Sequence, residues 1–187
     1  MSLENLKILM NKAPEEILKH FDIIKPPVDI KDLIRNKLNI TIDERLEWDK
    51  LFLDGYVQIE NDSPRIWLND GVSEARQNFT LAHELGHIVN DILPNSEKYQ
   101  DPIEDNFDTL YRKGVSPIER RANDFAARLL MPAAFIDEEV ERLSKSEDFK
   151  DISLETVIKR LSARFRVSYD AMKWRLVNLG YINKDKI

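Results

Sequence analysis

Hydrophobic residues recur at helical spacing along most of the chain, and one stretch departs from this spacing. Apolar positions three and four apart predict helix over residues 3–24, interrupted at Pro14, and again over residues 28–38. Pro26 and Pro27 separate the two segments, because a proline cannot donate the backbone N–H that a continuous helix needs. The N-terminal part of the chain is therefore expected to be helical.

The pattern changes between residues 39 and 69, where apolar and polar positions alternate as in a half-buried strand. Two strands are expected over residues 53–60 and 65–69, joined by the turn-forming cluster Asn-Asp-Ser-Pro at residues 61–64. We therefore predict a small, largely antiparallel sheet. Helical spacing then returns over residues 71–91.

Residues 94–116 carry the weakest structural signal, with two prolines, a glycine and five acidic residues. A connection of this length in a compact domain is either a solvated surface loop or a lid that faces a substrate. Ser116 and Pro117 then open a helix that extends to Pro132, because serine caps helix N-termini and proline suits the first turn. Two further helices are predicted over residues 153–165 and 168–179.

Bulk properties narrow the class of protein. A chain of 187 residues with 42% hydrophobic residues suits one compact domain, or one domain with a small appendage. No run of about 18 apolar residues is present, so no membrane span is expected, and the N-terminus lacks the features of a signal peptide. The absence of cysteine excludes disulfides and thiolate metal sites, and a cytoplasmic location is the simplest expectation. A net charge of -6 argues against nucleic acid as the main partner.

The strongest chemical signal is the pentapeptide from His83 to His87, an HExxH motif that holds two of the three histidines. On a helix, residues four apart lie on the same face, so both imidazoles can reach one metal ion. Glu84, beside the first histidine, is then placed to act as general base toward an attacking water. This arrangement is typical of a zinc-dependent hydrolase.

A catalytic zinc site of this type needs a third protein ligand. Cysteine is absent and His20 lies in a distant helix, so a carboxylate is expected. We favour Glu119, because small residues share its side of the helix and would allow close packing against the HExxH helix at Gly86. These small residues are Ala122, Asn123 and Ala126.

Glu119 also has a purely structural interpretation. Ser116 and Glu119 fit the capping-box spacing, in which the glutamate side chain bonds the backbone at the start of its own helix. The local pattern leaves the roles of metal ligand and helix cap open.

Residues 76–87 and 119–132, taken together, resemble the ImmA/IrrE family of metallopeptidases. The resemblance implies a zincin-like core with a metal held by His83, His87 and Glu119. It also implies that the substrate is a helix-turn-helix repressor that controls a mobile element or a stress response. Asn123 stands where many gluzincin-type enzymes have an aspartate that orients a histidine. Its uncharged amide should therefore tune the site more weakly.

We expect Zn²⁺ as the cofactor, although two histidines and a carboxylate also suit Mn²⁺, iron or cobalt. Glu84 would take the proton from water and deliver it to the leaving amine. The oxyanion needs a further donor, for which Tyr99, Tyr111 and Arg76 are candidates. An alternative is a regulatory protein that binds metal and a repressor or DNA without turnover.

The C-terminal helices offer the basis for that alternative. Residues 161–176 resemble a helix-turn-helix, and residues 153–182 hold six basic residues against two acidic ones. The competing interpretation, which we prefer, is a helical pair packed on the catalytic core. In all, we predict an α+β fold with a zincin-like domain over residues 1–137, in which a three- to four-stranded sheet packs on the HExxH helix. A helical extension is predicted over residues 138–187.

Overall fold

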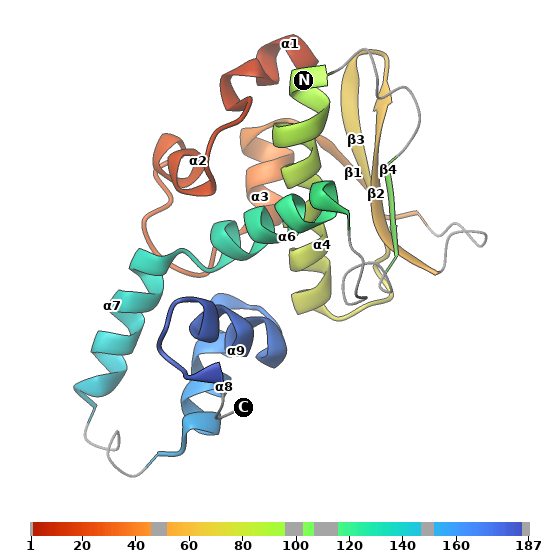
Figure 1. Cartoon of the computed structure of the whole chain (residues 1–187). Helices are drawn as coiled ribbons and strands as arrows, with labels where there is room; N and C mark the ends of the chain where they lie inside the picture. The colour runs from red at the N-terminus through yellow and green to blue at the C-terminus, as the bar shows by residue number, and fades with distance from the viewer. Residues whose placement is uncertain (1, 46–51, 96–102, 107–115, 147–151, 185–187) are drawn as a thin grey trace.

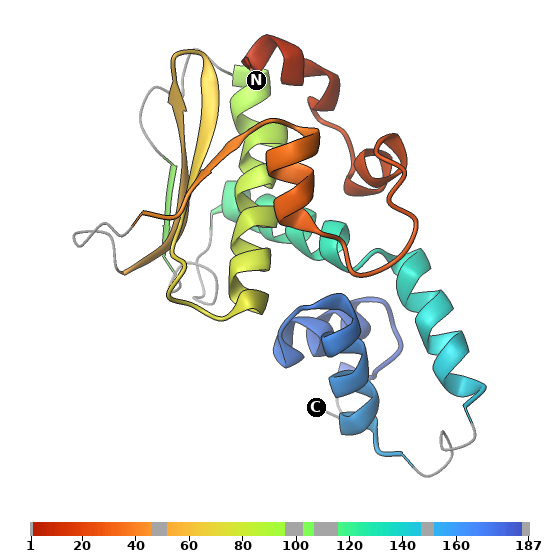
Figure 2. The same ribbon diagram turned by 180° about the vertical axis from the view of Figure 1, so that it is seen from behind.

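The computed structural model describes residues 2–45, 52–95, 103–106, 116–146 and 152–184. A small sheet covers one side of helix α4 (Glu74–His87), and helix α6 (Pro117–Leu130) crosses the same helix on another side (Figure 1). The view from behind shows the N-terminal helices beside α4 and the C-terminal helices grouped at one end of the molecule (Figure 2). The predicted α+β class is confirmed.

The N-terminal part is helical, as predicted, but in short pieces. Helices α1 (Leu3–Leu6) and α2 (Pro14–His20) are followed by α3 (Ile30–Asp32). A 3-10 turn, η1 (Lys7–Leu9), extends α1, and a π-helical turn, η2 (Leu33–Lys37), extends α3. Apolar side chains of all these segments lie in the main core.

The sheet has the strand order β1-β3-β2-β4. Strands β2 (Leu53–Glu60) and β3 (Ser63–Leu68) form the predicted hairpin, but β3 begins two residues earlier than predicted, so that Ser63 and Pro64 belong to the strand and not to the turn. Both residues of its turn, Asn61 and Asp62, have positive φ angles of 49° and 58°, which suit the right-handed twist of the paired strands. Strand β1 (Thr41–Asp43) pairs with β3 in parallel. The other two strand pairs are antiparallel, so the sheet is largely antiparallel, as expected.

The fourth strand corrects the expectation for residues 94–116. Strand β4 (Ile103–Asn106) lies inside this segment and pairs antiparallel with β2. Its four residues, Ile-Glu-Asp-Asn, carry little strand propensity, so the strand owes its existence to the backbone groups that β2 presents. The segment is thus not wholly irregular.

Both helices that carry the conspicuous motifs begin as the sequence indicates. The Ser73 hydroxyl accepts a hydrogen bond from the Arg76 N–H at the start of α4, and Ser116 does the same for Glu119 at the start of α6. Beyond His87 the chain continues as a π-helical turn, η4 (Ile88–Ile92), and a 3-10 turn, η5 (Leu93–Asn95).

Three helices complete the described chain: α7 (Ala133–Ser144), α8 (Leu154–Phe165) and α9 (Tyr169–Asn178). The last two match the predicted pair within one residue at each end. Leu161, Phe165 and Met172 are buried in the same core cluster as the N-terminal helices. The predicted domain boundary at residues 137–138 falls inside α7, and the division into two domains stays a prediction. Among the described residues, no helix has the length and apolar character needed to cross a membrane.

Candidate metal centre

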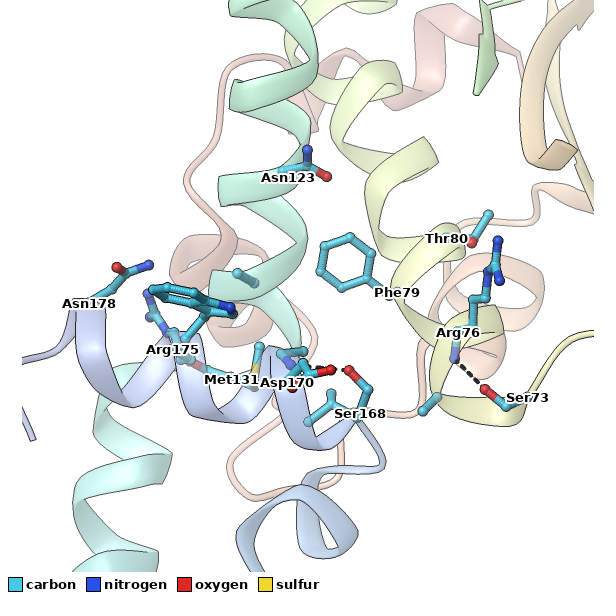
Figure 3. A pocket seen from close by; sticks show the side chains of 15 residues that line it. Ser73, Arg76, Phe79, Thr80, Asn123, Met131, Ser168, Asp170, Arg175 and Asn178 are labelled. Atoms are coloured by element: carbon cyan, nitrogen blue, oxygen red, sulfur yellow. Dashed lines mark hydrogen bonds between the residues drawn. The ribbon is translucent and has the colours of Figure 1, made fainter. Parts of the chain in front are cut away.

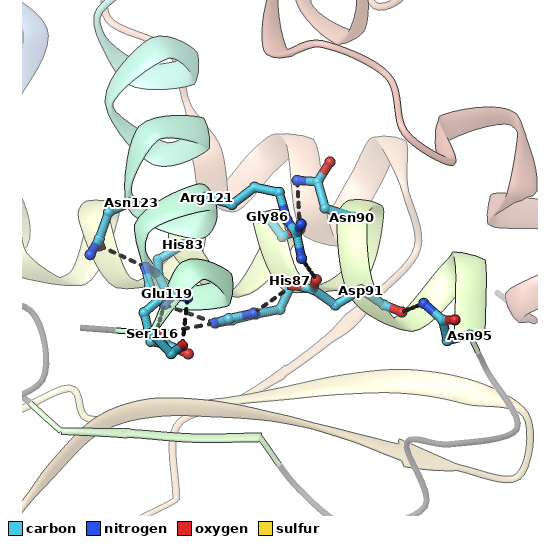
Figure 4. Close-up of polar contacts among 10 residues, drawn as sticks. All are labelled: His83, Gly86, His87, Asn90, Asp91, Asn95, Ser116, Glu119, Arg121 and Asn123. Carbon is cyan, nitrogen blue, oxygen red and sulfur yellow. Dashed lines mark hydrogen bonds and ion pairs between the residues drawn. The ribbon is translucent and has the colours of Figure 1, made fainter. Parts of the chain in front are cut away.

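Close contact between α4 and α6 brings the motif residues together. A Cβ atom placed on Gly86 would lie 3.2 Å from the Ala122 Cα atom and 3.2 Å from the Phe125 Cδ1 atom. The two helices therefore meet where α4 has no side chain, as the small residues of α6 suggested. His83 and His87, one turn apart on α4, face the first turn of α6, which carries Glu119 (Figure 4).

The donor atoms of these three residues converge. The Nε2 atoms of His83 and His87 are 2.9 Å apart. The Oε2 atom of Glu119 lies 3.2 Å from the first of these nitrogens and 3.6 Å from the second. Both histidines are buried and the Glu119 side chain is 14% exposed. The three side chains form a group that could hold a metal ion.

Hydrogen bonds on the far side of each imidazole orient the rings. The Nδ1–H of His83 donates to Asn123 Oδ1 over 2.9 Å, which is the contact predicted for that amide. The Nδ1–H of His87 donates to the buried Asp91 carboxylate over 3.0 Å. Asp91 in turn accepts from the Arg121 guanidinium. A carboxylate on a ligand histidine fixes its orientation and raises its basicity.

Asp91 was not among the site residues predicted from the sequence. The signal was available, because Asp91 follows His87 by four residues and therefore lies above it on the same helix face. A carboxylate at this spacing is common on helix surfaces, so it does not by itself indicate a role. What distinguishes Asp91 is burial: its side chain is only 2% exposed.

The donor set fits a divalent cation. With both Nδ1 atoms carrying protons, each Nε2 atom presents a lone pair toward the other and toward the Glu119 carboxylate. Lone pairs this close repel unless a positive charge lies among them. Ligands about 2.0–2.1 Å from a tetrahedral zinc would lie roughly 3.3 Å apart, and the observed separations run from 2.9 to 3.6 Å.

The backbone and the side chain of Glu119 make different contacts, the first with the start of α6 and the second with the two histidines. Its backbone N–H donates to the Ser116 hydroxyl over 3.2 Å, which caps α6. Its carboxylate instead points at the two histidines. The Ser116 half of the predicted capping box is therefore formed, whereas the Glu119 carboxylate that would complete the box points at the histidines.

Glu84 lies on the neighbouring face of α4, beneath strand β2, and its side chain is fully buried. A Cβ atom on Gly55 of β2 would lie 3.6 Å from the Glu84 Oε1 atom and 2.5 Å from the Thr80 Cγ2 atom. The missing side chain at Gly55 lets β2 pass directly over this part of the helix. The strand thus forms one wall around the candidate base.

Of the three candidate oxyanion donors, Arg76 is the one that the structure describes. Tyr99 and Tyr111 lie outside the described residues. The Arg76 guanidinium donates to the buried Asp54 carboxylate over 2.8 Å. This ion pair joins the start of α4 to β2, so Arg76 has a structural role whether or not it also contacts a substrate.

An HExxH helix under a small sheet, with a glutamate supplied by a second helix, defines a zincin-like metallopeptidase architecture. The sequence matches the Peptidase_M78 family, the IrrE N-terminal-like domain, over residues 33–177. This is more than half of the chain, and the protein belongs to that family, whose peptidases are metal-dependent. No curated protein matches the sequence. The family agrees with the ImmA/IrrE resemblance of the two motifs.

Proposed function

We propose that the protein is a zinc-dependent endopeptidase that cleaves a protein substrate, with a helix-turn-helix repressor as the expected substrate. The observation that carries this proposal is the convergence of His83, His87 and Glu119 beside a buried Glu84. His83, His87 and Glu119 would hold the metal. A bound divalent ion would supply Lewis-acid polarisation of water and of the scissile carbonyl.

The roles of the chain's own groups follow from their positions. Glu84 would accept the proton of the attacking water and return it to the leaving amine. Asn123 and Asp91 would hold the two imidazoles in the orientation that points both Nε2 atoms into the centre. Manganese remains a second candidate metal, since the same donor set suits it.

The sheet offers a way to bind an extended segment of the substrate. Strand β4 is the last strand in the order β1-β3-β2-β4. A peptide could add to its outer edge through main-chain hydrogen bonds, which recognise extended backbone irrespective of its sequence. The preference for a repressor comes from the family resemblance and not from this geometry.

The contacts of the C-terminal basic residues favour a packing role over DNA binding. Arg164 forms an ion pair with Glu139, and Lys159 forms one with Glu155. Arg175 is buried and donates to the Met131 carbonyl. Two of the six basic residues, Arg164 and Arg175, thus direct their charge at the protein itself and not at a DNA phosphate.

The decisive experiment incubates the purified protein with a repressor encoded beside it. Wild type and Glu84→Gln are compared, each with and without a chelator, after the metal content of both has been measured. We expect wild type alone to produce fragments, and Glu84→Gln to retain its metal, because Gln keeps the size of the side chain while removing the base. If the two proteins act alike on the repressor, the function is binding and not hydrolysis.

A further inference from the structure

The two imidazoles of the candidate metal centre are supported from the same helix, α6, by two different side chains. Asn123 accepts the hydrogen bond from His83 directly. Arg121 instead reaches His87 only through the carboxylate of Asp91. Figure 4 shows the Arg121 side chain extending from α6 toward η4, where its guanidinium meets that carboxylate. The proposed function does not yet assign a role to this contact.

The Asp91 carboxylate joins the two groups through separate oxygen atoms. Its Oδ2 atom accepts a hydrogen bond from the His87 Nδ1–H over 3.0 Å, and its Oδ1 atom accepts one from the Arg121 Nη2–H. The Asp91 side chain is only 2% exposed, and a carboxylate buried to this degree is stable only when it is paired and hydrogen-bonded. Arg121 supplies the opposite charge. Because it holds Oδ1, it also fixes the direction in which Oδ2 points.

Asn123 and Arg121 are two residues apart on α6, so they lie on nearly opposite sides of the helix and face different cavities. Asn123 lines a cavity of about 580 Å³ between α4, α6 and α9, together with Phe79 and Trp174 (Figure 3). Arg121 lines a separate cavity of about 320 Å³, to which α2 and the residues before it contribute. A substrate held in the first cavity would meet Asn123, whereas Arg121 would act on the centre through Asp91 or through its charge.

We propose that Arg121 is a positioning residue of the metal centre, which holds Asp91 so that its carboxylate keeps the His87 ring in the metal-binding orientation. This role rests on the proposed metal-dependent function and adds to it a residue that contacts neither the metal nor the substrate. The Arg121 side chain is 51% exposed, so its replacement lets water reach Asp91 and leaves no closed cavity in the core. The loss would therefore be one of orientation and not of core packing.

The charge of Arg121 and its positioning of Asp91 predict effects of opposite sign on metal affinity. Removing a positive charge near a divalent cation favours binding of that cation, because like charges repel. Removing the group that orients Asp91 weakens binding, because the His87 ring then loses its fixed direction. A lysine keeps the charge but lacks the rigid planar array of donors that a guanidinium presents. The sign of the change in affinity therefore separates the two effects.

The test compares the zinc affinities of wild type, Arg121→Lys and Arg121→Ala, measured by competition with a chromophoric chelator. We expect Arg121→Ala to bind zinc about 3–10-fold more weakly than wild type, a smaller loss than the 10–100-fold typical of removing a direct partner of a ligand histidine. Arg121→Lys should fall between these two proteins. The visible spectrum of the cobalt(II)-substituted proteins gives a second readout, since it depends on the geometry of the ligands, and it should change in Arg121→Ala.

Arg120→Ala is the matched control, because it removes the same charge from the neighbouring exposed position of α6. This variant should not bind zinc more weakly than wild type. The double variant Asp91→Ala, Arg121→Ala tests the route of the effect. If Arg121 acts through Asp91, its substitution should cause no further loss of zinc affinity once Asp91 is alanine. Urea unfolding of the metal-free proteins shows whether each variant is folded.

The outcomes separate this role of Arg121 from the metal centre itself. Zinc binding by Arg121→Ala that is as tight as in wild type, or tighter, would overturn the positioning role and leave the metal centre standing. An equal loss in Arg120→Ala, or the same loss from Arg121→Ala when Asp91 is already alanine, would also overturn it, since the effect would not pass through Asp91. Failure of wild type to bind zinc would instead refute the metal centre on which the proposed function depends.

Discussion

Replacing Gly86 with alanine sets two physical effects of opposite sign against each other. In the interior of an exposed helix, this change stabilises by about 1 kcal/mol, since alanine is the better helix former. In this protein the added Cβ atom would lie 3.2 Å from the Ala122 Cα atom and 3.2 and 3.3 Å from atoms of Phe125. The first of these neighbours is backbone, which cannot move without shifting α6.

The magnitude follows from this geometry. Adding a methyl group to a tightly packed core costs about 1–3 kcal/mol, which exceeds the gain in helix propensity of about 1 kcal/mol. We therefore expect Gly86→Ala to lower the free energy of unfolding by about 1 kcal/mol, which corresponds to a fall in Tm of about 2–4 °C for a chain of this length. A valine at this position should cost more, because its extra methyl groups meet the same helix.

The substitution also tests the link between packing and the site. Glu119 lies in the first turn of α6, so a displacement of this helix moves its carboxylate away from the histidines. We expect zinc affinity, measured by competition with a chromophoric chelator, to fall together with stability. The double variant Gly86→Ala, Phe125→Ala should show a favourable coupling energy, since alanine lacks the Cδ1 atom that meets the new methyl group.

One result would refute this reasoning. If urea unfolding showed Gly86→Ala to be about 1 kcal/mol more stable than wild type, with unchanged zinc affinity, the two helices would not be in the close contact described. The agreement between Gly86 and the small residues of α6 would then have no structural meaning.

Two further predictions concern buried carboxylates. Asp91→Ala should weaken zinc binding about 10–100-fold, because His87 loses the hydrogen bond that orients it. Asp124→Ala, at an exposed position, is the control and should leave zinc affinity unchanged. Equal zinc affinities of the two variants would show that Asp91 does not support the site. Burial would raise the pKa of Glu139, but hydrogen bonds from the Arg164 and Arg142 side chains hold that pKa below the ordinary value of 4.5. The unfolded chain therefore binds this proton more tightly, so the stabilisation is present above pH 4.5 and is lost as the pH falls further. Glu139→Gln should cost about 1–2 kcal/mol at pH 7 and less below pH 4, and a loss independent of pH in urea titrations would contradict this.

The regular elements could be predicted because their signals are local. The alternation over β2, the turn at Asn61 and the serine caps of α4 and α6 all depend on residues within one or two turns of one another. The pair of histidines belongs to this class, since four residues always bring two side chains to one helix face.

Strand β4 and the direction in which the Glu119 carboxylate points could not be predicted in the same way. The four residues of β4 have no strand pattern of their own and depend on pairing with β2, which lies some fifty residues earlier. The capping box and the metal ligand share one local sequence, so only the position of α4 shows where the Glu119 carboxylate points. The roles of these residues in catalysis stay predictions.

The sequence by itself determined the class of chemistry, because the HExxH helix and its partner motif specify residue types at fixed local spacing. Only the tertiary structure decided which groups meet across the helices. The burial of Asp91, the passage of β2 over Glu84 and the pocket beneath Trp174 all depend on long-range packing. Such packing is set by the shape of the whole core, and no short stretch of sequence encodes it.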